Sequence, residues 1–167
     1  RVNLESMKID HVYRVGSVPK VVAVTPDGGR VLVTNWCSWD MNVINAATGR
    51  PVRTLPLGAY PRGIAVSKDG RFALVAIMGS SHLLRVDLRT YRTRQIEVGS
   101  GPRAVALSDD GRTAYVTLNA EGKVAKVNLP VGGLIWVMII PMLLRIDFAA
   151  LRGVASHWRG IGVTFFI

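Results

Sequence analysis

The sequence contains one cysteine, three histidines and few acidic residues. Cys37 has no second cysteine for a disulfide, and a Cys-x-x-Cys-His haem attachment is excluded. His11, His82 and His157 are not spaced as metal ligands. No glycine-rich phosphate loop precedes a helix-like segment. We therefore predict no catalytic residue, no metal site and no cofactor in this chain.

The scarcity of acidic residues leaves a strongly basic chain. Its 167 residues include 21 Lys and Arg against 11 Asp and Glu, which gives a net charge of +10. Such a charge favours anionic partners, such as nucleic acid, anionic polymers, phosphates or an acidic membrane surface. The alternative is a solvated arginine surface, which is our interpretation of the run at 85–94.

Three motifs repeat in phase along the first 129 residues. A Gly-x-x-Pro element begins at Gly16, Gly58 and Gly99, at spacings of 42 and 41 residues. Asp-Gly turns at 27–28, 69–70 and 110–111 keep the same spacing, and so do the strand-ending residues Asn45, Asp87 and Asn128. Each unit holds short runs of alternating apolar residues between turn residues, which predicts four strands a to d. Four strands in about 40–45 residues is one blade of a β-propeller.

The repeat predicts individual strands and one irregularity. Strand b is expected at 30–35, 71–77 and 113–118, and strand c at 83–87 and 123–128. Strand a is expected at 21–25, 64–67 and 104–108, and strand d at 8–15 and 93–98. The doubled Gly28-Gly29 is interpreted as an inserted residue in the first a–b turn.

The repeat resembles a known family. Arg-Val-Leu-Val-Thr-Asn at 30–35 and Thr-Ala-Tyr-Val-Thr-Leu-Asn at 113–119 are similar to the signature of YVTN-type β-propellers, and the YncE-like group is the best match. The resemblance implies a bacterial, exported protein, either periplasmic or extracellular. Related propellers serve as binding modules, redox subunits and lactonases, so function has to be argued from a site.

We therefore expect an all-β partial propeller over 1–129, with a remnant at 1–15 and blades beginning near 16, 58 and 99. Three blades do not close a ring, because propellers have four to eight. The chain is accordingly expected to be a fragment. Its open blade edges favour self-association.

Residues 130–167 form a non-repeat, apolar and basic tail. Its uncharged run at 131–144 is too short to span a bilayer. Three interpretations stay open: a helix in contact with a membrane, a helix packed on the open sheet edge, or sequence that results from a frameshift or read-through.

Alternating strand directions place the b–c and d–a connections at one end of every blade. Lys20, Arg62 and Arg103 each follow the repeated proline there, and strand a is innermost in a propeller. They are predicted to form a basic arc near the central channel, where arginine can clamp carboxylate or phosphate. The alternative is that they only cover the blade junctions.

The b–c connections carry three further candidates. Trp36 and Trp39 are predicted to stack bases or sugar rings, or to form a lid over the blade edge. His82 is a candidate ligand or base, or an exposed polar residue.

The function expected from the sequence is a non-enzymatic binding or scaffold module for an anionic ligand, polymer, nucleic acid or protein partner. One alternative is a lactonase or lyase whose site needs further blades, with Asp40, His82 and Glu121 as the available groups. Another is an electron-transfer subunit that works with a separate cofactor domain.

The frameshift interpretation makes a prediction about the gene. If it holds, another reading frame downstream of the codon for Leu129 should encode the next Gly-x-x-Pro and Pro-Asp-Gly elements. Sequencing the gene and its flanks tests this, and an absence of repeat motifs in all three frames would contradict it.

Overall fold

A computed structural model describes residues 1–129, which form one compact unit, and 130–167 lie outside the described residues. The three interpretations of the tail, including membrane contact at 131–144, therefore concern residues that are not described. Within 1–129 the structure contains no helix with the length and apolar character needed to cross a membrane.

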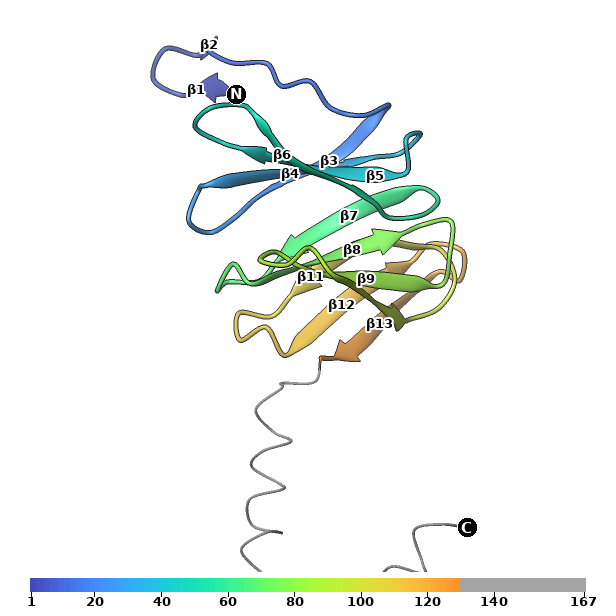
Figure 1. Ribbon diagram of the computed structural model, residues 1–167. Helices are drawn as coiled ribbons and strands as arrows, with labels where there is room; N and C mark the ends of the chain where they lie inside the picture. The colour runs from blue at the N-terminus through green and yellow to red at the C-terminus, as the bar shows by residue number, and fades with distance from the viewer. Residues whose placement is uncertain (130–167) are drawn as a thin grey trace, which may run out of the picture. The chain divides into compact units, whose positions relative to one another are not determined.

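Three antiparallel sheets follow one another along the chain (Figure 1). The first is β3 (Pro19–Val24), β4 (Arg30–Asn35), β5 (Asp40–Asn45) and β6 (Pro51–Pro56). The second is β7 (Pro61–Val66), β8 (Phe72–Ile77), β9 (His82–Asp87) and β10 (Thr93–Glu97). The third has three described strands, β11 (Pro102–Leu107), β12 (Thr113–Leu118) and β13 (Lys123–Asn128). A small hairpin of β1 (Val2–Asn3) and β2 (Lys8–Ile9) precedes them.

The sheets are arranged as propeller blades. Strands within each sheet are paired in chain order, and β7 contacts both β3 and β11. The first strands of neighbouring blades therefore lie side by side, as they do around a propeller axis. The predicted fold class, an all-β partial propeller of four-stranded blades, is confirmed.

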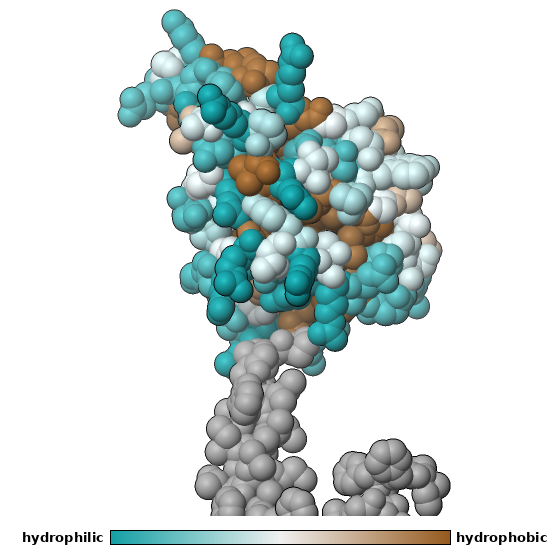
Figure 2. Space-filling model, viewed as in Figure 1, coloured by the Kyte–Doolittle hydropathy of each residue, from teal (hydrophilic) through white to brown (hydrophobic). Residues whose placement is uncertain are grey.

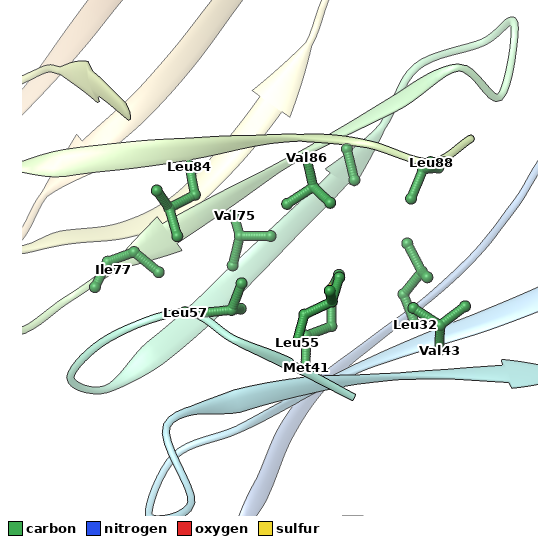
Figure 3. Close-up of a cluster of buried hydrophobic side chains, with 11 residues drawn as sticks. Leu32, Met41, Val43, Leu55, Leu57, Val75, Ile77, Leu84, Val86 and Leu88 are labelled. Carbon is green, nitrogen blue, oxygen red and sulfur yellow. The ribbon is translucent and has the colours of Figure 1, made fainter. Parts of the chain in front are cut away.

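Two apolar layers hold the blades together, one on each face of β8. Ala73, Val75 and Ile77 pack against the first blade (Figure 3). The first blade contributes Leu32 and Met41, among others, to this layer. The alternate residues of β8 pack against the third blade. This second layer consists of Phe72, Leu74, Ala76, Leu83, Ala114, Val116, Leu118 and Leu129.

Every residue of β8 is buried, because its period-2 side chains fill both layers. Most of the surface seen in Figure 2 is hydrophilic, with hydrophobic residues visible between the polar ones. This blade departs from the repeat signature because Ala76 and Ile77, which belong to the two apolar layers, stand where β4 has Thr34 and Asn35.

Strand b was predicted closely, and strands a and d differ from expectation. Strand a begins two or three residues earlier than predicted in every blade, because its proline already pairs with strand b, as Pro61 does with Ile77. At the N-terminus, strand β2 covers only Lys8–Ile9 of the predicted 8–15.

The interpretation of Gly28-Gly29 as an insertion is wrong. The turn from Thr25 to Arg30 has the same backbone hydrogen bond and length as the turn from Ser67 to Phe72. The extra residue of the 42-residue spacing is in strand d of the first blade. There, the register between β5 and β6 shifts by one residue, which leaves Val52 in a bulge that β10 lacks.

Each a–b turn is closed by a hydroxyl and a carboxylate. The Ser67 hydroxyl donates to Asp69 Oδ1 at 2.7 Å, and Ser108 does the same to Asp110 at 2.6 Å. Thr25 bonds Asp27 in the same way. These side-chain hydrogen bonds, followed by bonds from backbone amides, hold the pKa of Asp27, Asp69 and Asp110 below the usual value.

The turns predict acid sensitivity. These pKa values are lower in the folded protein than in the unfolded chain, so the unfolded chain binds more protons in acid. The free energy of unfolding therefore decreases as the pH is lowered. The loss of unfolding free energy should begin below about pH 5 and continue until the pH passes below the folded-state pKa values. Urea unfolding at a series of pH values measures it.

A variant with Asn at positions 27, 69 and 110 is the control, since the amide accepts a hydrogen bond but does not titrate. It should be less stable at neutral pH and should change less in acid. An equally steep acid loss in both proteins would show that other groups are responsible.

Candidate functional site

The three predicted basic residues lie at β-bulges. The register of strand a against strand b shifts by one residue at each repeated proline, at Lys20, at 62–63 and at 103–104. A bulge redirects the side chains at its position, and bulges are frequent next to functional sites. The three strands are adjacent, so the bulges repeat along one end of the inner strands.

The connections at this end are hydrogen-bonded to one another. Trp36 N donates to Val18 O at 2.9 Å, and Met78 N donates to Tyr60 O at 3.1 Å. Asn119 N donates to Gly101 O at 2.9 Å in the third blade. We call this end of the blades, made by 16–20, 36–39, 57–62, 78–81, 98–103 and 119–122, the mouth face. Its predicted pairing of b–c with d–a connections is confirmed.

A pocket of about 520 Å³ joins two of the three basic residues on the inner strands. Arg62 and Arg103 line it from neighbouring blades, and no acidic residue is among its described lining residues. The full lining is Val21, Arg62, Gly63, Ile64, Arg103, Ala104, Val105, Thr117 and Asn119.

Neither guanidinium is paired with a carboxylate in residues 1–129. Arg103 Nη1 donates to Asn119 Oδ1 at 3.2 Å, and Arg62 Nη1 lies 3.8 Å from Met78 Sδ. The two ion pairs of the described chain are elsewhere, between Arg1 and Asp10 and between Lys123 and Glu121. Both guanidiniums therefore keep their positive charge and most of their donors for another group.

The blades approach closely at this pocket. Thr34 Oγ1 donates to the carbonyl of Arg62 at 2.7 Å, which joins the first two blades. Gly63 lies against the backbone of β11, where an added Cβ would be 2.8 Å from Arg103 O and 2.9 Å from Ala104 Cα. The spacing of the two arginines is thus set by backbone contacts.

Aromatic side chains cluster beside the pocket. The ring centroids of Trp36 and Tyr60 are 4.8 Å apart, and those of Trp39 and Tyr60 are 6.1 Å apart in an edge-on arrangement. Lys20 Nζ and the Arg62 guanidinium carbon each lie 5.5 Å from the centre of the Trp36 ring. Both distances are within cation–π range.

Two residues of this cluster adopt a backbone conformation that favours glycine. Trp39 has φ of 56° and Tyr60 has φ of 60°. The residue before the repeated proline is left-handed in every blade, with φ of 56° at Val18 and 66° at Gly101. Such a conformation costs roughly 1–2 kcal/mol for a residue with a side chain.

Polar side chains under the first b–c connection are used by the fold. The Asn35 amide donates to Asp40 Oδ1 at 2.6 Å and to Asn42 Oδ1 at 2.8 Å. Asn42 Oδ1 also accepts from Gly16 N at 2.8 Å. Asp40, a candidate acid in the alternative hypothesis of an enzyme, therefore stabilises the loop through a hydrogen bond.

His82 and Glu121 are not joined to the basic and aromatic residues. His82 begins β9, an outer strand, where it is opposite Glu97 of β10. Glu121 accepts from Ser100 N at 2.7 Å and from Lys123 Nζ at 3.2 Å, and these bonds lower its pKa. Within 1–129 no three His, Cys, Asp or Glu side chains are grouped as metal ligands.

The opposite end of the blades has its own pocket of about 500 Å³, in which Asp27 and Asp87 accompany Arg30, Arg71 and Arg89. Asp27 is bonded within its own turn, and the Arg30 guanidinium donates to Leu88 O. This pocket is therefore mixed in charge, unlike the pocket lined by Arg62 and Arg103.

The structure brings together most of the predicted site. Lys20, Arg62, Trp36 and Trp39 meet in one cluster, and Arg103 joins Arg62 in the pocket. Sequence reasoning missed three residues: Tyr60, which connects the two tryptophans, and Thr117 and Asn119, which line the pocket. The position of Tyr60 directly before a repeated proline was an available signal.

Comparisons with known proteins identify the fold. No family model matches the chain, and no curated protein does. Among solved structures it is similar to hydrazine synthase of Kuenenia stuttgartiensis, with a TM-score of 0.60 and 22% sequence identity. The match covers 73% of this chain and 39% of that one, so the chain spans well under half of its structural neighbour. This likeness supports the blade architecture alone.

The close approach at Gly63 predicts the effect of a methyl group. Gly63→Ala should lower the unfolding free energy by about 1–3 kcal/mol, because the Cβ meets backbone atoms that move only with β11. Denaturant unfolding measures this change. Gly29→Ala is the matched control, since its Cβ would meet only the exposed Asp27 side chain. Equal stability of both variants would show that the two strands separate easily.

Proposed function

We propose that this partial propeller is a non-enzymatic binding or scaffold module whose mouth face holds an anionic partner. The observation that carries the proposal is the pocket in which Arg62 and Arg103 face a shared space without an acidic lining residue. Lys20 extends the positive charge to the first blade.

Two guanidiniums from separate strands suit a carboxylate or a phosphate. Arginine offers parallel N–H donors that bind such groups in a bidentate manner. Asn119 holds Arg103 through a neutral acceptor, which orients the guanidinium and leaves its charge uncompensated. A concave basic site also concentrates anions from solution. The net charge of +10 acts in the same direction over the whole chain.

The family proposal rests on sequence motifs. We infer that the blades are of the YVTN type and resemble the YncE-like group, because β4 ends in Val-Thr-Asn at 33–35 after a Pro-Asp-Gly turn. On that inference the protein is bacterial and is exported to the periplasm or beyond. Self-association through blade edges is a further partner proposal, which the exposed Val22 and Val24 of β3 support.

The enzyme alternative gains no supporting observation in residues 1–129. A lactonase or lyase site needs acid, base or metal ligands that converge near the channel. Asp40 accepts from Asn35 in its own connection, and Glu121 accepts from Ser100 N of the neighbouring d–a connection. His82 is on an outer strand.

The proposal predicts salt-sensitive binding of a polyanion. Inorganic polyphosphate should bind the full chain with a slope of about −2 to −3 in log affinity against log salt, as expected for two or three released counterions. Reversing Lys20, Arg62 and Arg103 to Glu should abolish the binding. Fluorescence titration at several salt concentrations provides the measurement.

A second triple variant controls for total charge. It reverses three basic residues near the opposite end of the second blade: Lys68, Arg71 and Arg89. Both triple variants change the net charge equally, so only the mouth-face variant should lose binding. Equal losses would mean that polyphosphate responds to overall charge, and the site would be rejected.

A further inference from the structure

The aromatic cluster of the mouth face is unusually accessible. Trp39 is 50% exposed and Tyr60 is 40% exposed, while Trp36 is partly buried beneath its cations. Large aromatic side chains are usually buried or matched by a partner. We call Trp36, Trp39 and Tyr60 the aromatic platform.

The backbone fixes the platform in place. Leu57 N donates to Trp39 O at 2.9 Å, and Met78 N donates to Tyr60 O at 3.1 Å. Both donors come from neighbouring connections, so each left-handed aromatic residue is tied to a second segment. The left-handed backbone at Trp39 and Tyr60 is therefore held by hydrogen bonds to a second segment.

Arg62 connects the platform with the anion pocket. Its guanidinium lies over the Trp36 ring at 5.5 Å, and the same side chain lines the pocket beside Arg103. A charged pocket and exposed aromatic rings are thus neighbours that share one residue. A ligand that occupies both the pocket and the aromatic platform would need a negatively charged group close to a planar ring.

We propose that the ligand is a nucleotide unit, an inference that rests on the proposed anion-binding function. Its phosphate lies between Arg62 and Arg103. Its base stacks on the face of one exposed ring, Trp39 or Tyr60, and meets the other ring with its edge, because the two rings are edge-on to each other. Aromatic side chains and arginine planes both stack on nucleobases, and every base offers a π face. The unit is either a free nucleotide or part of a single strand.

The same surface fits other polyanions less well. Polyphosphate has the charge without a ring, and an acidic sugar chain has an aliphatic ring without a π system. The Arg62 guanidinium, the Trp36 ring and the Tyr60 ring already pack in series, with the two rings tilted by 35°, and a further planar group extends that arrangement. These ligands are therefore the comparisons in the test.

The experiment measures binding of labelled oligothymidylate, thymidine monophosphate, polyphosphate and hyaluronate to the full chain. Oligothymidylate should bind more tightly than polyphosphate of equal charge. Trp39→Ala and Tyr60→Ala should each weaken the binding of oligothymidylate by about 5- to 150-fold, which is the range for the loss of one stacked base. Both should leave polyphosphate binding unchanged, which also shows that the variants are folded.

Conservative variants separate ring stacking from loop structure. Trp39→Phe and Tyr60→Phe keep an aromatic ring and should retain most of the oligothymidylate affinity. Tyr115→Ala removes an aromatic residue that is 47% exposed on β12 and outside the platform, so it should have no effect. Thymidine monophosphate binding that also depends on the platform would assign a free nucleotide, and binding of the strand alone would assign single-stranded nucleic acid.

Three results decide the matter. If polyphosphate binds through Arg62 and Arg103 but the alanine variants leave oligothymidylate unaffected, the nucleotide inference is wrong and the anion site stands. Tighter binding of hyaluronate than of oligothymidylate, lost in the same variants, would assign an acidic sugar instead. If none of the four ligands binds, both proposals fail.

Discussion

The two apolar layers on β8 position everything at the mouth face. Alternate side chains of this strand are buried in opposite directions, so the middle blade is fixed between its neighbours. Deleting one of these larger side chains, such as Leu74, removes contacts in a layer shared by two blades, and such truncations cost about 2–5 kcal/mol. The layers hold the sheets together, and the backbone contacts at Gly63 then set the distance between the inner strands that carry Arg62 and Arg103.

Much of the fold follows from the sequence, since blade strands have a strong period-2 pattern. The bounds of β4, β12 and β13 were predicted to the residue. The inner strands were predicted to start too late, because a proline is a poor strand signal although Pro19, Pro61 and Pro102 pair at the strand edge. The bulge at Val52 was misplaced to Gly28-Gly29, because adjacent glycines suggest an insertion more readily than a valine does.

The site was partly predictable for a related reason. Residues that repeat with the blade, Lys20, Arg62 and Arg103, could be assigned to one end from strand direction alone. Residues that occur in one blade alone could not be assigned to the site in this way. Tyr60 has a valine and a glycine at its equivalent positions, and Asn119 resembles any loop amide. Spatial proximity between blades has no signature in a single sequence, so the joining of the aromatic platform to the pocket required the structure.

The two junctions between inner strands are built differently, although the blades repeat. The first uses the Thr34 hydroxyl on the Arg62 carbonyl, and the second uses the missing side chain of Gly63 against the Arg103 carbonyl. The residue equivalent to Thr34 in the second blade is Ala76, which has no donor. Each blade therefore makes contacts that are specific to its own neighbour. If the order of the blades were exchanged, the same strands would form, but the contacts between neighbouring inner strands would no longer match. The order of the blades in this repeat is therefore fixed.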